Sequence, residues 1–240
     1  MLSVAEAQDR VLAAVEPLAT ARVRVADALG LTLAEDLHAP HPLPRFDNSA
    51  MDGYAVRAVD TKGASEADPV ELAIAGEVRA GFVMGAGGRE GTNALRPGTA
   101  VRIMTGAPVP DGADAIVPVE VTEEAGSTVR IKEEVGPGRH VRPAGDDVEA
   151  GRLVVGAGTD LGAGEMALIA SLGLSPVPVR PRPRVAILVT GDELVPPEAE
   201  PGPGQIRDSN SIALTSLVRT AGAEPDLRAH VPDDRAATLD

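Results

Sequence analysis

The chain has 240 residues, of which 43% are hydrophobic and 24% are charged, a balance typical of globular proteins. It contains no cysteine, which excludes disulfides, thiolate metal sites and thiol nucleophiles. Its formal net charge of −14 argues against nucleic acid as the main partner, because a phosphate backbone is bound by a basic face. No apolar run approaches the roughly 20 residues that cross a bilayer, so we expect a cytoplasmic protein that does not bind membranes.

The first element that we expect is a surface helix. Ser3 and Glu6 have the spacing of a capping box, and apolar residues recur at helical spacing as far as Pro17. A second apolar run, residues 25–37, leads into residues 39–44, where three prolines within five residues force an extended connector. This connector is a candidate domain boundary.

The pattern changes after the connector. Residues 46–141 form short alternating runs separated by glycine and proline turns, which predicts a mostly-β lobe. The chain leaves this lobe near Gly145, and residues 164–173 predict a short helix closed by a C′ glycine. We therefore expect a helical linker domain made of residues 1–44 and 147–181, with a β-rich lobe of residues 45–146 inserted into it.

A third domain is predicted to begin at residue 182. A Pro/Arg hinge at residues 180–184 precedes residues 185–189, an uninterrupted apolar run typical of a buried parallel strand. Residues 209–221 have helical spacing, and we expect a second strand over residues 227–231. Together with the first strand, these elements form one βαβ unit. Because two strands cannot bury a doubly wound sheet, we expect residues 182–240 to be the truncated start of an α/β domain.

Residues 46–55 have the composition of a binding site. They contain two of the chain's three aromatic residues together with two carboxylates, an asparagine, a serine and a glycine. Polar residues at this density cannot all be buried cheaply, which favours a functional stretch. The alternative is a turn-rich loop that leads into a strand.

Two further stretches of the predicted β lobe carry polar groups. In residues 102–110, the Thr105 hydroxyl follows a strand and two prolines hold the next turn, which suits an anion contact and equally a structural β-turn. In residues 140–147, Asp146 and Asp147 follow an arginine and a glycine. This pair suits contact with a hard cation or a ribose, and equally a solvated surface.

The turn at residues 190–193 places Asp192 and Glu193 just past the carboxyl end of the predicted parallel strand. Open α/β sheets bind ligands there, at their topological switch points, so we favour a functional role for this turn. The sequence has no P-loop, no complete dinucleotide fingerprint and no histidine spacing suited to zinc.

Taken together, these stretches resemble the molybdopterin molybdenumtransferase family, the MoeA and gephyrin E-domain type enzymes of molybdenum cofactor synthesis. The resemblance covers essentially the whole chain, although family members are longer. It rests on residues 46–55, 102–108, 142–147, 189–194 and 204–210. One departure is Asp146, which stands where the family usually has glutamate.

The resemblance implies an α/β multidomain fold: a helical linker domain with an inserted mostly-β lobe, followed by an incomplete three-layer α/β (MogA/MoaB-like) molybdopterin-binding domain. It implies insertion of molybdate into adenylylated molybdopterin, with Mg²⁺ aiding the release of AMP. The expected partners are these substrates, a second copy in a homodimer and other proteins of molybdenum cofactor synthesis. The alternatives are a catalytically incompetent fragment that acts as a dimerisation or scaffold module, and a homologue that handles tungsten.

Carried over residue by residue, the resemblance assigns functional roles within this sequence. The catalytic cleft is expected to contain Asp52, Thr105, Asp147, Glu193 and Asp233. The pterin end of the substrate is expected to contact Asp208, Ser209 and Asn210. Because carboxylates and the anionic substrates repel one another, Mg²⁺ held by carboxylates and water is expected between them, and its ligands are left open. Most family contacts to pterin and molybdate lie past residue 240, so we expect little transferase activity from these residues alone.

Overall fold

The computed structural model describes residues 2–81 and 95–227. The chain divides into two compact units, one formed by Met1–Leu37 with Val155–Asp240 and the other by His38–Val154. The finer boundaries predicted within the first unit stay a prediction.

The first unit begins with the predicted helix, α1 (Val4–Ala13). The capping box is formed as expected: the Ser3 hydroxyl accepts a hydrogen bond from the Glu6 backbone N–H at 3.2 Å, and the Glu6 carboxylate accepts one from the Ser3 N–H at 2.7 Å. All residues of α1 are exposed, including Val4 (77%) and Val11 (63%). The apolar spacing suggested a helix as far as Pro17, but the helix ends earlier, at Ala13.

The predicted linker contains strands as well as helix. A three-stranded antiparallel sheet has the order β1 (Ala21–Val23), β13 (Val177–Arg180) and β2 (Thr32–Leu33). The predicted second helix is present as α2 (Ala163–Ser171), and Gly173, at φ 69°, ends it as a left-handed C′ residue. The core of this part buries Leu33, Leu161, Ile169, Leu172, Val177 and Val179.

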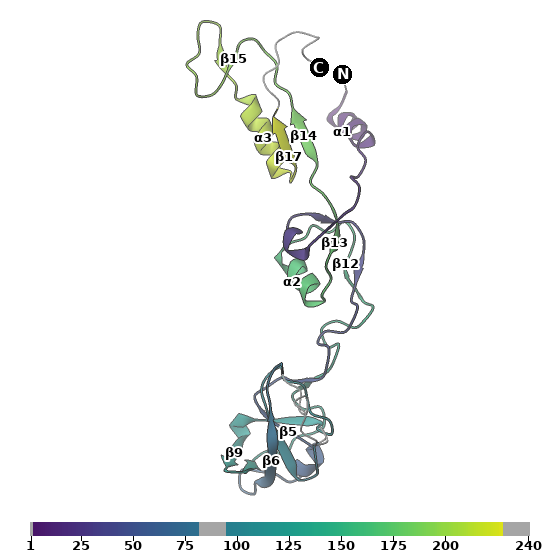
Figure 1. The fold of residues 1–240 in the computed structure, drawn as a ribbon, viewed down its shortest axis with the longest axis vertical. Helices are drawn as coiled ribbons and strands as arrows, with labels where there is room; N and C mark the ends of the chain where they lie inside the picture. The colour runs from purple at the N-terminus through teal and green to yellow at the C-terminus, as the bar shows by residue number, and fades with distance from the viewer. Residues whose placement is uncertain (1, 82–94, 228–240) are drawn as a thin grey trace. The chain divides into compact units, whose positions relative to one another are not determined.

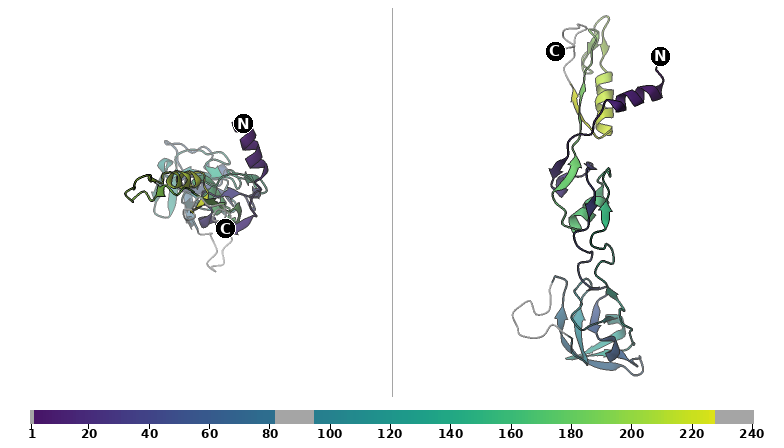
Figure 2. Two further views of the ribbon diagram at one scale, coloured as in Figure 1. Left: turned by 90° about the horizontal axis from the view of Figure 1, so that it is seen from above. Right: turned by 90° about the vertical axis from the view of Figure 1, so that its right-hand side faces the viewer.

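A parallel βαβ unit follows the hinge, but its second strand covers Glu224–Leu227, whereas the prediction placed it at residues 227–231, of which 228–231 lie outside the described residues. β14 (Arg184–Ile187) pairs in parallel with β17 (Glu224–Leu227), and α3 (Asn210–Thr220) contacts both strands (Figure 1 and Figure 2). Ile187 is buried, whereas Val185 on the same strand is 37% exposed. The strand predicted as fully buried is therefore mostly exposed, with Ile187 the one buried residue of its four, and the described part of this sheet has two strands.

The second unit is the mostly-β lobe, and its main sheet is six-stranded with the order β8-β5-β7-β6-β10-β9. Figure 1 labels three of these strands, β5, β6 and β9. All neighbouring pairs are antiparallel except β6 and β7, which run parallel. In chain order the six strands are β5 (Gly53–Val56), β6 (Val70–Val78), β7 (Thr99–Ile103), β8 (Ala115–Pro118), β9 (Thr122–Ala125) and β10 (Thr128–Ile131).

Both faces of this sheet are covered at β5, whereas β6, β9 and β10 have exposed residues. Along β5, Tyr54 and Val56 belong to one apolar cluster, while Ala55 between them belongs to the other. The alternation follows from the two-residue period of a strand, which sends successive side chains to opposite faces. A strand buried on both sides gives the neighbouring polar loops a fixed base.

The remaining elements are short. Two-residue and three-residue strands form the pairs β4–β11, β3–β12 and β15–β16. Their bounds, with those of the three 3₁₀ turns, are β3 (Leu37–His38), β4 (Asn48–Ser49), β11 (Val141–Arg142), β12 (Leu153–Val155), β15 (Leu194–Val195), β16 (Ile206–Arg207), η1 (Val25–Asp27), η2 (Ala58–Thr61) and η3 (Val119–Val121).

The described residues include no helix that is both long and apolar enough to cross a membrane. The α/β multidomain class predicted from the sequence is confirmed by these elements and by the comparisons reported below.

Candidate functional site

Three polar stretches that lie far apart in the sequence meet in the second unit. We call residues 46–55, 102–110 and 140–147 together the motif cluster. The first and third stretches are joined because β4 and β11 pair antiparallel. The first and second stretches are joined by backbone hydrogen bonds. Residues 46–55 are thus the common partner of the other two.

Ser49 makes the backbone contacts to the second stretch. Its carbonyl accepts a hydrogen bond from the Gly106 N–H at 2.8 Å, and its own N–H donates to the Ala107 carbonyl at 3.0 Å. The Ala107 N–H also closes a turn by donating to the Met104 carbonyl at 2.9 Å. Gly106 has a φ of 77°, a left-handed conformation that glycine adopts without strain. The structural β-turn is present, and it faces the first stretch.

Asp52 and Thr105, predicted separately as site residues, are in direct contact. The Asp52 carboxylate oxygen Oδ1 accepts hydrogen bonds from the Thr105 backbone N–H and from its hydroxyl, both at 2.7 Å. The hydroxyl that was predicted as an anion contact therefore orients this carboxylate. Because both bonds end on Oδ1, the second oxygen, Oδ2, has no donor among the described residues.

These contacts favour the ionised form of Asp52. The hydrogen bond from the Thr105 hydroxyl lowers the pKa of Asp52 most, followed by the Thr105 backbone N–H and, more weakly, by the charge of Arg102. Burial acts in the opposite direction without cancelling them. Asp52 therefore presents an ionised, oriented carboxylate on an exposed surface.

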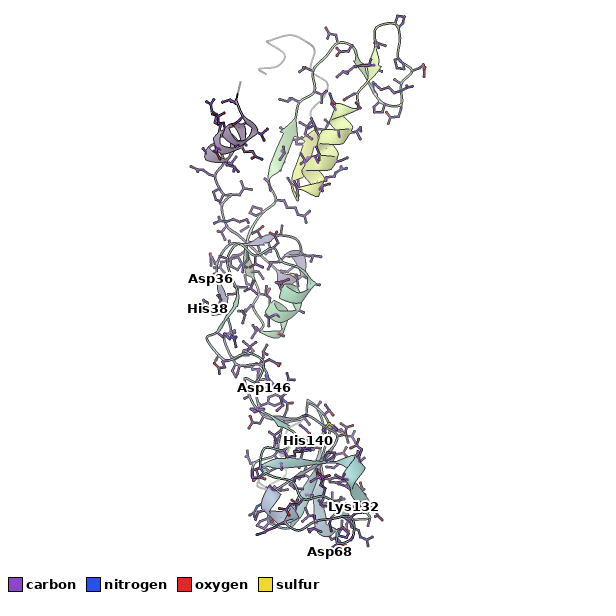
Figure 3. All side chains as sticks on the ribbon, turned by 180° about the vertical axis from the view of Figure 1, so that it is seen from behind. Asp36, His38, Asp68, Lys132, His140 and Asp146 are labelled. Carbon is purple, nitrogen blue, oxygen red and sulfur yellow. The ribbon has the colours of Figure 1, made fainter. Side chains whose placement is uncertain are left out.

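Asp147 and its neighbour Asp146 are held by one arginine. The Arg142 guanidinium donates from Nη2 to Asp147 Oδ1, and its Nε lies 3.5 Å from Asp146 Oδ2. Figure 3 shows Asp146 and His140 from the stretch that includes this arginine. The three side chains are 42–54% exposed, so the ion pairs add little stability, but they fix where the charges lie.

Glu193 lies in the first unit, in the predicted turn after β14. A Cβ atom added to Gly191 would lie only 2.8 Å from the Glu193 carboxylate oxygen Oε2. Gly191 also has a φ of 140°, so the backbone of this turn favours glycine, whereas the exposed Glu193 carboxylate could move aside for a Cβ. The Glu193 carbonyl accepts from the Ile206 N–H at 2.8 Å, which ties the turn to β16.

The residues predicted at the pterin end surround the start of α3. Asp208 Oδ1 accepts a hydrogen bond from the Ser211 backbone N–H at 2.9 Å, which satisfies a free donor of the first helical turn. Ser209 is the N-cap residue, and Asn210 is the first residue of the helix. Both are exposed. Asp208 therefore has a capping role whatever else it does.

The eight predicted residues fall into three groups. Asp52, Thr105 and Asp147 belong to the second unit. Asp233 lies outside the described residues. The first unit contains Glu193, Asp208, Ser209 and Asn210.

The described residues contain no group of three or more His, Cys, Asp or Glu side chains placed to hold a metal ion. Among these residues, Asp52 offers an oriented carboxylate of the kind that serves as a ligand for divalent cations such as Mg²⁺. A closed, all-protein metal cage is not what these residues form.

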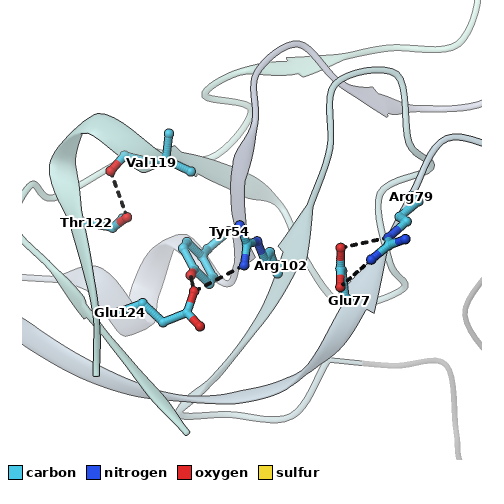
Figure 4. A network of polar contacts seen from close by, with 7 residues as sticks. All are labelled: Tyr54, Glu77, Arg79, Arg102, Val119, Thr122 and Glu124. Carbon is cyan, nitrogen blue, oxygen red and sulfur yellow. Dashed lines mark hydrogen bonds and ion pairs between the residues drawn. The ribbon is translucent and has the colours of Figure 1, made fainter. Parts of the chain in front are cut away.

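A polar network beside Asp52 was missed by sequence reasoning. The Tyr54 hydroxyl donates to Glu124 Oε2 at 2.5 Å, and Arg102 Nη1 lies 3.4 Å from the same oxygen (Figure 4). Burial, followed by this hydrogen bond, raises the pKa of Tyr54 to about 12. The signal in the sequence was weak, because Glu124 is 70 residues from Tyr54 and lies on β9, which is not a neighbour of β5 in the sheet.

The chain matches two family models. Residues 2–173 match the MoeA N-terminal region (domain I and II), and residues 186–240 match a probable molybdopterin binding domain. Over 236 residues the chain is 46% identical to molybdopterin molybdenumtransferase 2 of Mycobacterium tuberculosis, covering 98% of this chain and 56% of that protein. It is 41% identical to the molybdopterin molybdenumtransferase of a Nostoc species, covering 88% and 47%.

A solved structure gives the same result. The crystal structure of a molybdopterin biosynthesis MoeA protein from Pyrococcus horikoshii has a TM-score of 0.82 and 36% identity, covering 99% of this chain and 59% of that one. The chain therefore belongs to the MoeA family of molybdopterin molybdenumtransferases. It spans about half the length of the curated relatives that it matches.

Proposed function

We propose that the protein containing this chain works in molybdenum cofactor biosynthesis, as a transferase that inserts molybdate into adenylylated molybdopterin and releases AMP. The family membership supports the pathway and the class of enzyme. The observation that carries the proposal for this chain is the Asp52 carboxylate, which Thr105 orients within the motif cluster through two hydrogen bonds.

The charges of the site explain what Asp52 would do. Molybdate and the adenylate phosphate are anions, so a bare carboxylate would repel them. Bound Mg²⁺ would supply the positive charge that lets carboxylate and phosphate approach, and Asp52 Oδ2 is the atom offered to it. Asp52 must remain ionised for this role, and the two hydrogen bonds from Thr105 favour the ionised form.

Arg142 and Asp147 would serve the same site through the arrangement of their charged groups. The guanidinium between Asp146 and Asp147 keeps both carboxylates from repelling each other, and it fixes them on one turn. We propose Asp147 as a second carboxylate for substrate or Mg²⁺, and Glu193 with the start of α3 as the contribution of the α/β part. We also propose that the protein forms a homodimer, which a measurement of its mass in solution would test. We propose a cytosolic location, which cell fractionation would test.

The test is complementation of a bacterial strain that lacks its own molybdopterin molybdenumtransferase. The protein containing this chain should restore the activity of a molybdenum-dependent enzyme, and Asp52→Asn should reduce that activity at least tenfold, because it removes the charge. The matched control is Asp60→Asn. Asp60 Oδ2 also accepts a backbone bond in the same unit, from the Gly98 N–H at 2.9 Å, but it lies outside the motif cluster.

Two results would count against the proposal. Failure of the unchanged protein to restore the activity would refute the assigned reaction. Restoration by Asp52→Asn equal to that by Asp60→Asn would refute the role of Asp52 while leaving the reaction intact.

A further inference from the structure

Asp47 makes two hydrogen bonds in two directions, one from its backbone and one from its side chain. Its carbonyl accepts from the Val109 N–H at 3.0 Å, in the second stretch of the motif cluster. Its carboxylate oxygen Oδ1 accepts from the Ala144 N–H at 2.7 Å, in the third stretch. One residue of the first stretch is therefore bonded to both of the others.

The side-chain bond is directed at the turn that carries the charged groups. Ala144 lies between Arg142 and Asp147, the pair whose ion pair fixes the charges of this stretch. The Ala144 bond spans 97 residues of sequence, so it is a tertiary contact and not a local turn. A carboxylate that accepts a backbone N–H makes a shorter and stronger hydrogen bond than a neutral acceptor, and 2.7 Å is such a distance.

The far side of the same turn is bonded to the connector. The Gly145 N–H donates to the Pro44 carbonyl and the Asp147 N–H donates to the Leu43 carbonyl, both at 3.0 Å. These bonds hold the end of the turn, whereas Asp47 holds its middle. Without the Asp47 carboxylate, the segment between Arg142 and Gly145 loses a tertiary hydrogen bond at its centre.

We propose that Asp47 is a positioning residue of the site, which acts through the Ala144 N–H to fix the turn that carries Arg142 and Asp147. The proposal rests on the proposed function, because the turn matters only if Asp147 serves the reaction. Asp47 itself does not touch substrate in this account. Its contribution is to keep the third stretch in register with Asp52 and Thr105.

The chain contains a closely matched control. Asp36 Oδ1 accepts a hydrogen bond from the Ala157 N–H, also at 2.7 Å and also between exposed residues far apart in sequence. This bond lies in the first unit, whereas the motif cluster belongs to the second (Figure 3 labels Asp36). Asp36→Ala therefore removes the same chemical contact without touching the proposed site.

The first experiment measures amide hydrogen exchange by NMR on the ¹⁵N-labelled chain. Asp47→Ala should speed exchange at Ala144 about tenfold, the order expected for losing one hydrogen bond to a charged group. Asp36→Ala should speed exchange at Ala157 and leave Ala144 unchanged. Unchanged exchange at Ala144 in folded Asp47→Ala would overturn the proposal.

The second experiment separates acceptor geometry from charge. Asp47→Asn keeps an oxygen acceptor at the same reach, whereas Asp47→Glu keeps the charge and moves the acceptor by one methylene. Because a neutral acceptor makes a weaker hydrogen bond than a carboxylate, we expect the asparagine variant to retain part of the exchange protection at Ala144 and of the complementing activity, and the glutamate variant to lose more of both. The reverse order would overturn the proposal, and this comparison remains decisive should Asp47→Ala fail to fold.

The complementation assay distinguishes this inference from the proposed function. If Asp47→Ala and Asp36→Ala restore activity equally while exchange at Ala144 is faster in the former, the bond exists but the positioning role is refuted. If the unchanged protein restores no activity, the proposed function fails and the positioning role fails with it. The expected result is a tenfold or greater loss for Asp47→Ala with Asp36→Ala unaffected.

Discussion

Gly53 is the residue at which the sequence of the motif cluster is most tightly constrained by packing. It begins β5, between β7 and β8, and it directly follows Asp52. A Cβ atom added at this position would lie 2.1 Å from the Val117 carbonyl oxygen and 2.9 Å from its carbonyl carbon. Val117 is fully buried, so this backbone cannot move outward to relieve the contact. Gly53→Ala must therefore separate β5 from β8.

The size of the effect follows from that geometry. Overpacking a core costs about 1–3 kcal/mol, and a backbone carbonyl yields less than a side chain does, so we expect the upper end of this range. At a urea dependence of about 1–3 kcal/mol per molar, a loss of about 3 kcal/mol lowers the unfolding midpoint by about 1 M or more. Asp52 loses its place beside Thr105 in the same step, so complementing activity should fall too.

The assay measures tyrosine fluorescence during unfolding in urea. Tyr54 is the sole tyrosine, the chain has no tryptophan, and Tyr54 is the next residue of β5, so tyrosine fluorescence in urea reports the unfolding of this lobe. Gly136→Ala is the matched control, because a Cβ there has no atom within 4 Å. It should unfold at or slightly above the midpoint of the unchanged protein. A Gly53→Ala midpoint equal to that of Gly136→Ala would refute the packing argument.

Two further predictions concern titration. Thr105→Val removes the hydroxyl that lowers the pKa of Asp52 most, so that pKa should rise toward its ordinary value in a ¹³C NMR titration. Because the folded-state pKa of Asp52 is lowered, the stability that Asp52 contributes is present above its unfolded-state pKa and is lost as pH falls through its folded-state pKa. The free energy of unfolding of the Thr105→Val variant should therefore fall less on acidification than that of the unchanged protein. An unchanged Asp52 titration in the variant would contradict this prediction. Tyr54 should ionise near pH 12 in an absorbance titration, and Glu124→Gln should lower that value. Since the folded-state pKa of Tyr54 is raised, the stability that the protonated tyrosine contributes is fully present below its unfolded-state pKa of about 10 and is lost as pH rises toward 12. Ionisation of Tyr54 near pH 10 in the folded protein would contradict the buried hydrogen bond.

The sequence by itself determined the features that depend on neighbouring residues. Ser3 and Glu6 predicted a helix start because a capping box needs only residues three apart, and Gly173 predicted a helix end for the same local reason. The strands of the β lobe and the βαβ unit were equally visible as alternation and as an apolar run. The family resemblance pointed to Asp52, Thr105 and Asp147 as separate positions.

Only the tertiary structure decided which of these positions touch. Asp52 and Thr105 are 53 residues apart, and Asp47 and Ala144 are 97 apart, so each contact depends on the path of the chain between them. The antiparallel pairing of β5 with β7 brings Asp52 to Thr105, and the separate pairing of β4 with β11 brings Asp47 to Ala144. A sequence records that a residue can accept a hydrogen bond, but the donor that reaches it is chosen by long-range strand pairing, which no local pattern encodes.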